Sequence, residues 1–340
     1  MIQEPLLDVR NLRVRFETPR GLLRAVDDVS FSVAPRETVG IVGESGSGKS
    51  VTMLSVLRLF PPLARVAVSG QVLFEGTDLL RLSEAELREV RGAKIGMVFQ
   101  DPLTSLNPAL PVGEQIAESL RTHRGLSRVA ARRRAEELLE LVGIPDPARR
   151  ADDLPYRFSG GMRQRIMIAI AIACEPKLLI ADEPTSALDV TVQAQVLVLL
   201  ERLQRELGMS LIMISHDLGV IAATSRRVLV MYGGWIVERG SVEEILERPG
   251  HPYSAALTRL VPDLDQPRDE PLVPIPGQPA PVVGPVGGCR FAARCAYVMD
   301  RCRQETPPAV ALATEHISLC WLSADGVRPA PAPIPAGGRR

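Results

Sequence analysis

The 340-residue sequence predicts an α/β fold built around a mostly parallel sheet. One observation is the short apolar run at residues 38–42, which ends in a glycine-rich turn and continues into a helical pattern at residues 50–60. A second observation is a set of short apolar runs that end in polar residues and are separated by helical segments. These runs are residues 95–100, 177–182 and 210–216. The alternation favours parallel strands with functional groups at their carboxyl ends.

Two further parts complete the predicted core. Near the start of the chain apolar and polar residues alternate, as in Leu12, Val14 and Phe16 and later in Val29, Phe31 and Val33. This period of two predicts an N-terminal antiparallel sheet. Residues 112–141 are rich in charged residues and have a helical pattern, so we expect a helical subdomain inserted at about residues 103–160.

Composition and charge exclude several classes of protein. The apolar fraction is 46% and the charged fraction 24%, as in globular domains. Lys and Arg number 40, as do Asp and Glu, so no basic excess is available to hold nucleic acid. The first ten residues contain Glu4 and Asp8 and do not resemble a secretory signal. Because no apolar run reaches the roughly 18 residues of a membrane span, we expect a cytoplasmic protein that meets a membrane through a partner.

The turn after residue 42 matches the phosphate-binding P-loop at every fixed position. It consists of Gly43, Glu44, Ser45, Gly46, Ser47, Gly48, Lys49 and Ser50, between a predicted strand and a predicted helix. The glycines allow the backbone amides to point at phosphates, and the helix N-terminus adds its positive dipole. Lys49 is expected to reach the β- and γ-phosphates of ATP, and Ser50 to ligate Mg²⁺. We predict nucleotide contacts from Gly43 through Val51.

The apolar run at residues 178–182 ends in Asp182, is followed by Glu183 and has the form of a Walker B element. Asp182 is expected to hold Mg²⁺, and Glu183 to polarise the attacking water. An acid pair at a sheet edge without catalytic function is the alternative. The P-loop upstream favours catalysis.

Residues 158–164 (FSGGMRQ) precede a long apolar helix, residues 166–174, and resemble the signature motif of the ABC ATPase family. The resemblance implies a P-loop NTPase core in which Ser159, Gly160 and Gly161 bind the γ-phosphate of the nucleotide held by a second subunit. It therefore implies a head-to-tail dimer. The commonest form of the motif has Leu and Gln where this chain has Phe158 and Met162. A helix cap that binds nothing is the alternative for Ser159.

Three other positions fit the ABC family in order and spacing. By resemblance, Gln100 senses Mg²⁺ and the attacking water and links to the membrane subunit, Asp189 organises the dimer interface, and His216 contacts the γ-phosphate. Phe16 matches the aromatic residue that stacks on adenine. It fits equally well as a core residue of a strand.

Residues 100–115 (QDPLTSLNPALPVGEQ) and the C-terminal part of the chain resemble the di/oligopeptide and nickel importer branch. The C-terminal likeness rests on His251, Pro252 and Tyr253, on Ile275, Pro276 and Gly277, and on Cys289, Phe291, Arg294 and Cys295. It implies an ATP-hydrolysing subunit that powers peptide import with two permease subunits, a sister ATPase and, indirectly, an extracytoplasmic solute-binding protein. It also implies a peripheral position at the cytoplasmic face of the membrane. Nickel import and a soluble, non-transport ABC ATPase are the alternatives.

With this resemblance, we expect an ATPase domain at residues 1–250, a cysteine-containing extension at 251–322 and a disordered tail at 323–340. The extension holds Cys289, Cys295, Cys302 and Cys320, separated by five, six and seventeen residues. Four thiolates suit an iron-sulfur cluster or zinc, although the close pair typical of structural zinc is absent. Unligated thiols are the third possibility, and the resemblance implies a [4Fe-4S] cluster. Cys174 is expected to be a small buried core residue.

Overall fold

The computed structural model describes residues 4–260, 274–284 and 287–329, which form two compact units. The first unit contains the chain up to Asp8, Ser32–Thr38 and Val72–Ser215. The second contains Val9–Phe31, Val39–Gln71 and the chain from His216 onward. Each unit is therefore assembled from segments that are far apart in the sequence.

The first unit contains three parallel strands in the order β6, β7, β8. They are β6 (Ile95–Val98), β7 (Leu178–Asp182) and β8 (Ser210–Ser215). Ile95 pairs with Leu178, and Leu178 pairs with Ser210. All residues of β7 and β8 are buried, which explains why both strands occur as continuous apolar runs.

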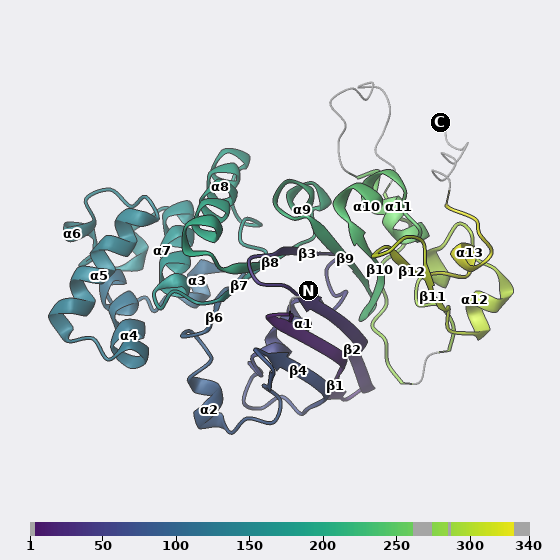
Figure 1. The fold of residues 1–340 in the computed structure, drawn as a ribbon, viewed down its shortest axis with the longest axis horizontal. Coiled ribbons are helices and arrows are strands. Elements are labelled where there is room, and N and C mark those ends of the chain that lie inside the picture. The colour runs from purple at the N-terminus through teal and green to yellow at the C-terminus, as the bar shows by residue number, and fades with distance from the viewer. Residues whose placement is uncertain (1–3, 261–273, 285–286, 330–340) are drawn as a thin grey trace. The chain divides into compact units, whose positions relative to one another are not determined.

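Most of the helices of the first unit lie between β6 and β8 in the chain. They are α3 (Pro102–Ser105), α4 (Val112–Arg124), α5 (Arg128–Leu141), α6 (Pro147–Arg150), the 3₁₀ turn Pro155–Arg157, α7 (Gly160–Ile172) and α8 (Val190–Leu207). Helix α2 (Glu84–Arg88) precedes β6. Helix α4 packs against α5 and α7, and Figure 1 shows these three helices side by side with α6. The contact surface is apolar because Ile116 and Leu120 of α4 and Leu138 of α5 are buried.

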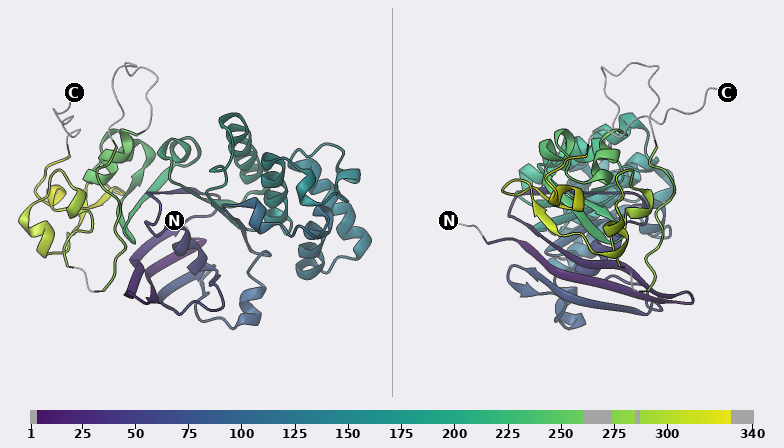
Figure 2. Two further views of the ribbon diagram at one scale, coloured as in Figure 1. Left: turned by 180° about the vertical axis from the view of Figure 1, so that it is seen from behind. Right: turned by 90° about the vertical axis from the view of Figure 1, so that its right-hand side faces the viewer.

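The second unit contains a five-stranded arrangement in the order β11, β12, β10, β9, β3. Its strands are β3 (Thr38–Val42), β9 (Arg227–Tyr232), β10 (Trp235–Ser241), β11 (Ala309–Ala311) and β12 (Ile317–Leu319). β3 and β9 are parallel, whereas β10, β12 and β11 add in antiparallel fashion. Figures 1 and 2 show the yellow-green strands of the C-terminal part beside β10. The C-terminal part thus extends the sheet that carries the P-loop strand.

The N-terminal strands form a separate four-stranded sheet in the order β2, β1, β4, β5. Its strands are β1 (Leu7–Thr18), β2 (Gly21–Val33), β4 (Val66–Phe74) and β5 (Thr77–Asp78). Leu12 and Val14 are fully buried and alternate with exposed residues, as the period of two predicted. The predicted α/β fold, with an antiparallel N-terminal sheet and parallel strands, is confirmed.

The other helices of the second unit are short. They are α1 (Lys49–Val56), α9 (Leu218–Thr224), α10 (Val242–Glu247), α11 (Pro252–Thr258), the 3₁₀ turn η2 (Ala292–Arg294), α12 (Asp300–Gln304) and α13 (Trp321–Ala324). The first two residues of the expected tail belong to α13, and residues 330–340 lie outside the described residues. Within the described ranges, no helix combines the length and the apolar character needed to cross a membrane.

Candidate nucleotide site and cysteine cavity

The P-loop lies in the second unit, where β3 ends at Val42 and α1 begins at Lys49. Lys49 is buried, and its Nζ donates hydrogen bonds to the carbonyl oxygens of Gly43 at 2.6 Å and Glu44 at 3.1 Å. The Ser47 amide also donates to the Glu44 carbonyl, at 3.1 Å. The loop therefore curves around the lysine ammonium group, as the motif requires.

The two fixed glycines of the motif are required by close backbone contacts. A Cβ at Gly43 would lie 2.2 Å from the carbonyl oxygen of Met231, and a Cβ at Gly48 would lie 2.6 Å from that of Ala25. Gly48 also has a φ of +104°, which an L side chain rarely adopts. It caps α1 without a side-chain hydrogen bond, so the helix N-terminus is suited to an anionic ligand.

Two other predicted nucleotide contacts also lie in the second unit. Phe16 is half-buried in β1, and its ring centroid is 6.1 Å from that of Phe60 in an edge-on contact. His216 is exposed and follows β8 directly in the chain. Adenine stacking by Phe16 and phosphate contact by His216 stay predictions.

The first unit brings two predicted catalytic residues together. Glu183 follows the last residue of β7, and Gln100 Nε2 donates a hydrogen bond to its Oε2 at 3.1 Å. Both Glu183 and the neighbouring Asp182 are buried. Glu183 has a φ of +46°, a left-handed backbone conformation that is uncommon outside glycine. Strain of this kind concentrates at functional sites, which agrees with a catalytic role for this carboxylate.

The signature residues begin helix α7 in the first unit. The Ser159 hydroxyl accepts a hydrogen bond from the Met162 amide at 3.3 Å and caps the helix, while Ser159 and Gly160 are exposed. A Cβ at Gly161 would lie 2.5 Å from Val192, so this glycine lets α7 approach α8. Phe158, the departure from the common motif, is buried and leaves the exposed serine and glycine unchanged.

Asp189, the predicted dimer-interface residue, caps helix α8. Its Oδ1 accepts a hydrogen bond from the Val192 amide at 3.0 Å. Ser159 and Asp189 therefore each have a local structural role as helix caps, and their roles toward a second subunit stay predictions.

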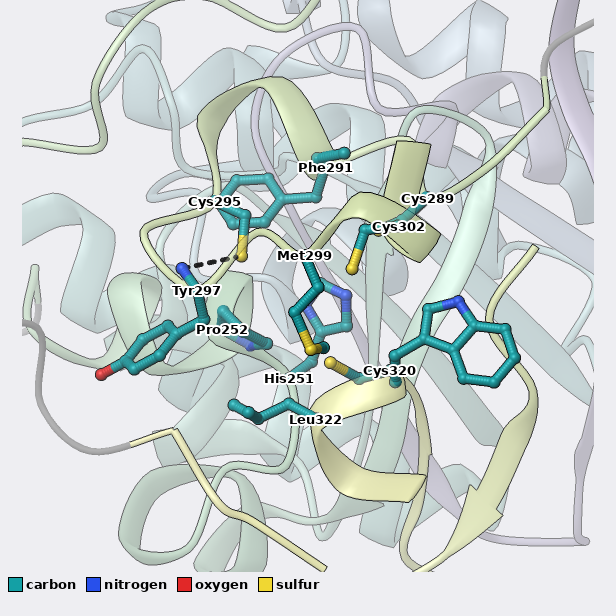
Figure 3. Close-up of a pocket in the computed structure, with 12 residues that line it drawn as sticks. His251, Pro252, Cys289, Phe291, Cys295, Tyr297, Met299, Cys302, Cys320 and Leu322 are labelled. Carbon is teal, nitrogen blue, oxygen red and sulfur yellow. Dashed lines mark hydrogen bonds between the residues drawn. The ribbon is translucent and has the colours of Figure 1, made fainter. Parts of the chain in front are cut away.

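The four C-terminal cysteines line one cavity in the second unit (Figure 3). The cavity is also lined by His251, Pro252, Phe291, Ala292, Tyr297, Met299, Trp321 and Leu322. Cys289 and Cys295 flank the 3₁₀ turn η2, Cys302 lies in α12, and Cys320 precedes α13. The Cys289 amide donates a hydrogen bond to the Cys302 carbonyl at 2.7 Å, which joins two of these segments. Cysteines that are distant in the sequence thus converge on one space.

The surroundings of the thiols are apolar but contain amide donors. Burial raises the pKa of the Cys289 thiol to about 12 and that of Cys295 to about 11. The backbone amides of Phe291 and Tyr297 oppose these shifts, and the Tyr297 amide lies 3.4 Å from the Cys295 sulfur. Buried thiols of this kind become thiolates when a positive metal centre compensates their charge.

His251 presents an unsatisfied donor at the same cavity. Its Nδ1 accepts a hydrogen bond from the Tyr253 amide at 3.0 Å, so Nε2 carries the proton of the neutral ring. Burial lowers the pKa of His251 to about 4, which keeps the ring neutral at neutral pH. Within the described part of the chain, the buried Nε2 has no hydrogen-bond partner. An anionic sulfur acceptor in the cavity would satisfy this group, so the residues fit a thiolate-bound cofactor.

The cysteine side chains do not show a preformed metal site in the described residues. Among residues 4–260, 274–284 and 287–329, no group of three or more Cys, His, Asp or Glu side chains is arranged to hold one ion. The expected metal ligation by the four cysteines is therefore not shown.

Comparison with known proteins places these features in a family. The sequence pattern of the ABC transporter family matches residues 26–186, and that of the oligopeptide/dipeptide transporter C-terminal region matches residues 237–302. The oligopeptide transport ATP-binding protein OppD of Bacillus subtilis is 50% identical over 93% of this chain and 88% of its own. The chain belongs to the ABC transporter family. The dipeptide transport ATP-binding protein DppD of the same organism is 49% identical to this ABC ATPase over 94% of this chain and 95% of its own.

Solved structures agree with this assignment. A dimeric ATP-binding cassette in a post-hydrolysis state, bound to ADP and Pi, superposes on this ABC ATPase with a TM-score of 0.62 at 29% identity. The match covers 69% of this chain and 98% of the other. The ABC ATPase binds and hydrolyses ATP, and Mg²⁺ is the metal typical of its family.

The sequence reasoning missed a buried carboxylate that positions the cavity histidine. Glu238 of β10 is fully buried and accepts hydrogen bonds from the amides of Gly250 at 2.6 Å and His251 at 2.8 Å. Its Oε1 also lies 2.6 Å from Nε2 of His316. The available signal was a lone acid directly after the apolar residues 235–237, because a charge in a buried strand needs partners.

Proposed function

We propose that this ABC ATPase powers the import of di- or oligopeptides through a membrane permease. The observation that carries the proposal is the match of residues 237–302 to the C-terminal region of oligopeptide and dipeptide transporters. The names of the relatives, which include oligopeptide and dipeptide transport proteins, support the same substrate class. The P-loop and the two acids at the carboxyl end of β7, Asp182 and Glu183, provide the groups needed for ATP hydrolysis.

The expected machinery is a dimer of ATPase subunits attached to two permease subunits at the cytoplasmic face of the membrane. Ser159 and Gly160 are exposed at the N-terminus of α7, which suits a contact with the nucleotide of a second subunit. The likeness to a dimeric cassette supports this arrangement. We infer that the second subunit is a sister ATPase and that a solute-binding protein delivers the peptide on the other side.

Within one subunit, we assign the hydrolytic step to Glu183. Lys49 and Ser50 would bind the phosphates and Mg²⁺, and Asp182 would hold Mg²⁺ from the Walker B strand. The Glu183 carboxylate would act as a general base, polarising the attacking water and accepting its proton. The 3.1 Å hydrogen bond from Gln100 fixes the orientation of that carboxylate.

Peptide uptake by membrane vesicles that contain the complete transporter tests this function. We expect labelled di- or oligopeptides to accumulate with ATP, and Glu183→Gln to bind ATP but to slow hydrolysis and uptake by about 10²-fold or more. The control is Glu175→Gln, which removes an exposed carboxylate paired with Arg134 and should keep wild-type uptake. Uptake of Ni²⁺ without peptide, or hydrolysis that persists in Glu183→Gln, would contradict the proposal.

We further propose that Cys289, Cys295, Cys302 and Cys320 ligate a [4Fe-4S] cluster. The support is the convergence of four soft ligands on one cavity, with amide donors toward the sulfurs and the unsatisfied His251 Nε2. Such a cluster would supply a redox-active, four-point link between segments of the extension. The residues of the chain would supply ligands, exclude water and donate hydrogen bonds to sulfur.

Anaerobic purification tests the cluster. We expect a brown protein with about four irons and about four sulfides per chain. Cys295→Ser should lose most of this iron, whereas Cys174→Ser should keep it, because the Cys174 thiol is buried elsewhere and lies 3.6 Å from the Ser119 carbonyl oxygen. Stoichiometric zinc, or a colourless protein without metal, would contradict the cluster and leave the ATPase assignment unaffected.

A further inference from the structure

Residues of the C-terminal part of the chain form hydrogen bonds with Glu44, the second residue of the P-loop. Arg294 faces the Glu44 carboxylate with two nitrogens: Nη2 donates to Oε1 at 2.9 Å, and Nη1 donates to Oε2. The Tyr253 hydroxyl oxygen accepts a hydrogen bond from the Glu44 amide at 2.8 Å. The side chain of Arg294 is 6% exposed and that of Glu44 is 26% exposed, so the ion pair is largely shielded from water.

The Arg294 side chain is also held by hydrogen bonds to the backbone of the C-terminal part of the chain. Its Nε donates to the carbonyl oxygen of Pro276 at 2.7 Å, and its Nη2 donates to that of Gly277 at 3.1 Å. The hydrogen bonds to Glu44 raise the pKa of Arg294 above its usual value, so the guanidinium stays charged. A planar guanidinium with hydrogen bonds on both edges has little conformational freedom, so it holds the Glu44 carboxylate in one position.

Tyr253 is equally restricted. Its ring is buried, with its centroid 4.7 Å from that of Tyr232 and 5.3 Å from that of Phe291. These aromatic contacts fix the ring and therefore the position of the hydroxyl oxygen.

Glu44 connects these contacts to the lysine that binds phosphate. Its carbonyl oxygen accepts hydrogen bonds from Lys49 Nζ and from the Ser47 amide, each at 3.1 Å. The amide, the carboxylate and the carbonyl of Glu44 are therefore all engaged. A shift of Glu44 would move a group that borders the Lys49 ammonium, and the P-loop lysine contributes directly to nucleotide affinity.

We propose that Arg294 and Tyr253 are positioning residues for nucleotide binding that act through Glu44. The C-terminal extension then supports the nucleotide site through Glu44. This inference rests on the nucleotide-binding role of the P-loop and does not depend on the transported substrate or on the cysteine ligands.

Nucleotide affinity of the full-length protein tests the proposal. Displacement of a fluorescent ATP analogue by Mg·ATP gives the Kd, and Arg294→Gln should weaken it about tenfold because charge-assisted hydrogen bonds are lost. The hydrolysis rate at saturating ATP should change less than about threefold, since the effect is on binding. Arg294→Lys should give an intermediate Kd because lysine keeps the charge but not the two-point geometry. Tyr253→Phe, which keeps the ring, should weaken binding severalfold.

Arg301→Gln is the matched control. Arg301 directly precedes Cys302 just as Arg294 precedes Cys295, but it pairs with Asp325 and not with the P-loop. It should therefore keep the wild-type Kd. If Arg294→Gln does not fold, as judged by circular dichroism and thermal unfolding, Arg294→Lys and Tyr253→Phe decide the question by the same measurement.

A double-mutant cycle separates action through Glu44 from general destabilisation. In a Glu44→Ala background, Arg294→Gln should weaken ATP binding less than about twofold further, because the partner is already absent. A wild-type Kd in Arg294→Gln, an equal loss in Arg301→Gln, or full additivity in the cycle would overturn the proposal. If the wild-type protein does not bind ATP, the proposed function fails instead.

Discussion

At the scale of single residues, Gly48 illustrates why the P-loop motif has fixed glycines. Its left-handed backbone and its closeness to the Ala25 carbonyl oxygen both exclude a side chain. Gly46, in the same loop, also has a left-handed φ, of +78°, but apart from its chain neighbours no atom of the described residues lies within 4 Å of where its Cβ would be. A comparison of the two glycines therefore distinguishes the free-energy cost of a left-handed backbone from the cost of a steric clash.

We predict that Gly48→Ala destabilises the protein more than Gly46→Ala. Both variants carry the left-handed penalty of roughly 1–2 kcal/mol, and only Gly48→Ala adds a clash, which costs about 1–3 kcal/mol more. Thermal or denaturant unfolding without nucleotide measures the difference. Equal destabilisation would mean that the loop can move away from Ala25.

Residue identities at the nucleotide site could be predicted, because each follows from chemistry at a fixed spacing. Lys49 and Glu183 were predicted in this way, and the structure adds the hydrogen bond from Gln100 to Glu183. The contact between Glu44 and Arg294 could not be predicted, since these residues are 250 positions apart. A motif specifies residue types, whereas a partner from a distant segment is set by tertiary packing.

At the scale of elements, the buried parallel strands were the easiest to predict. The runs at residues 177–182 and 210–216 agree with β7 and β8 to within one residue at each end. Strands buried on both faces have uninterrupted apolar sequences, so their signal is strong. The break between α4 and α5 also had a signal, because Gly125 has a left-handed conformation and Ser127 caps α5.

The short strands of the extension have no recognisable pattern of apolar residues in the sequence. β11 and β12 contain three residues each, too few for a period of two to be recognised. Their position depends on pairing with β10, in which Glu238 is opposite Ser318. That pairing joins segments that are 80 residues apart, so local sequence could not predict it.

At the scale of the whole chain, the buried Glu238 joins the sheet to the C-terminal segments. It receives hydrogen bonds from two amides at the start of α11 and from His316, just before β12. The Ser323 hydroxyl of α13 adds a bond to the carbonyl oxygen of Gly250 at 2.7 Å. A buried carboxylate is tolerated only with such partners, and its removal leaves those partners unsatisfied.

We therefore predict that Glu238→Ala lowers the free energy of unfolding by about 3–5 kcal/mol, because two buried amides and His316 lose their acceptor. Glu238→Gln should cost less, since one acceptor oxygen remains. Denaturant unfolding of the full-length protein measures both. Glu247→Ala, an exposed acid in the same region, is the control and should change stability by less than about 0.5 kcal/mol. If Glu238→Ala matches this control, the extension is held by its apolar contacts alone.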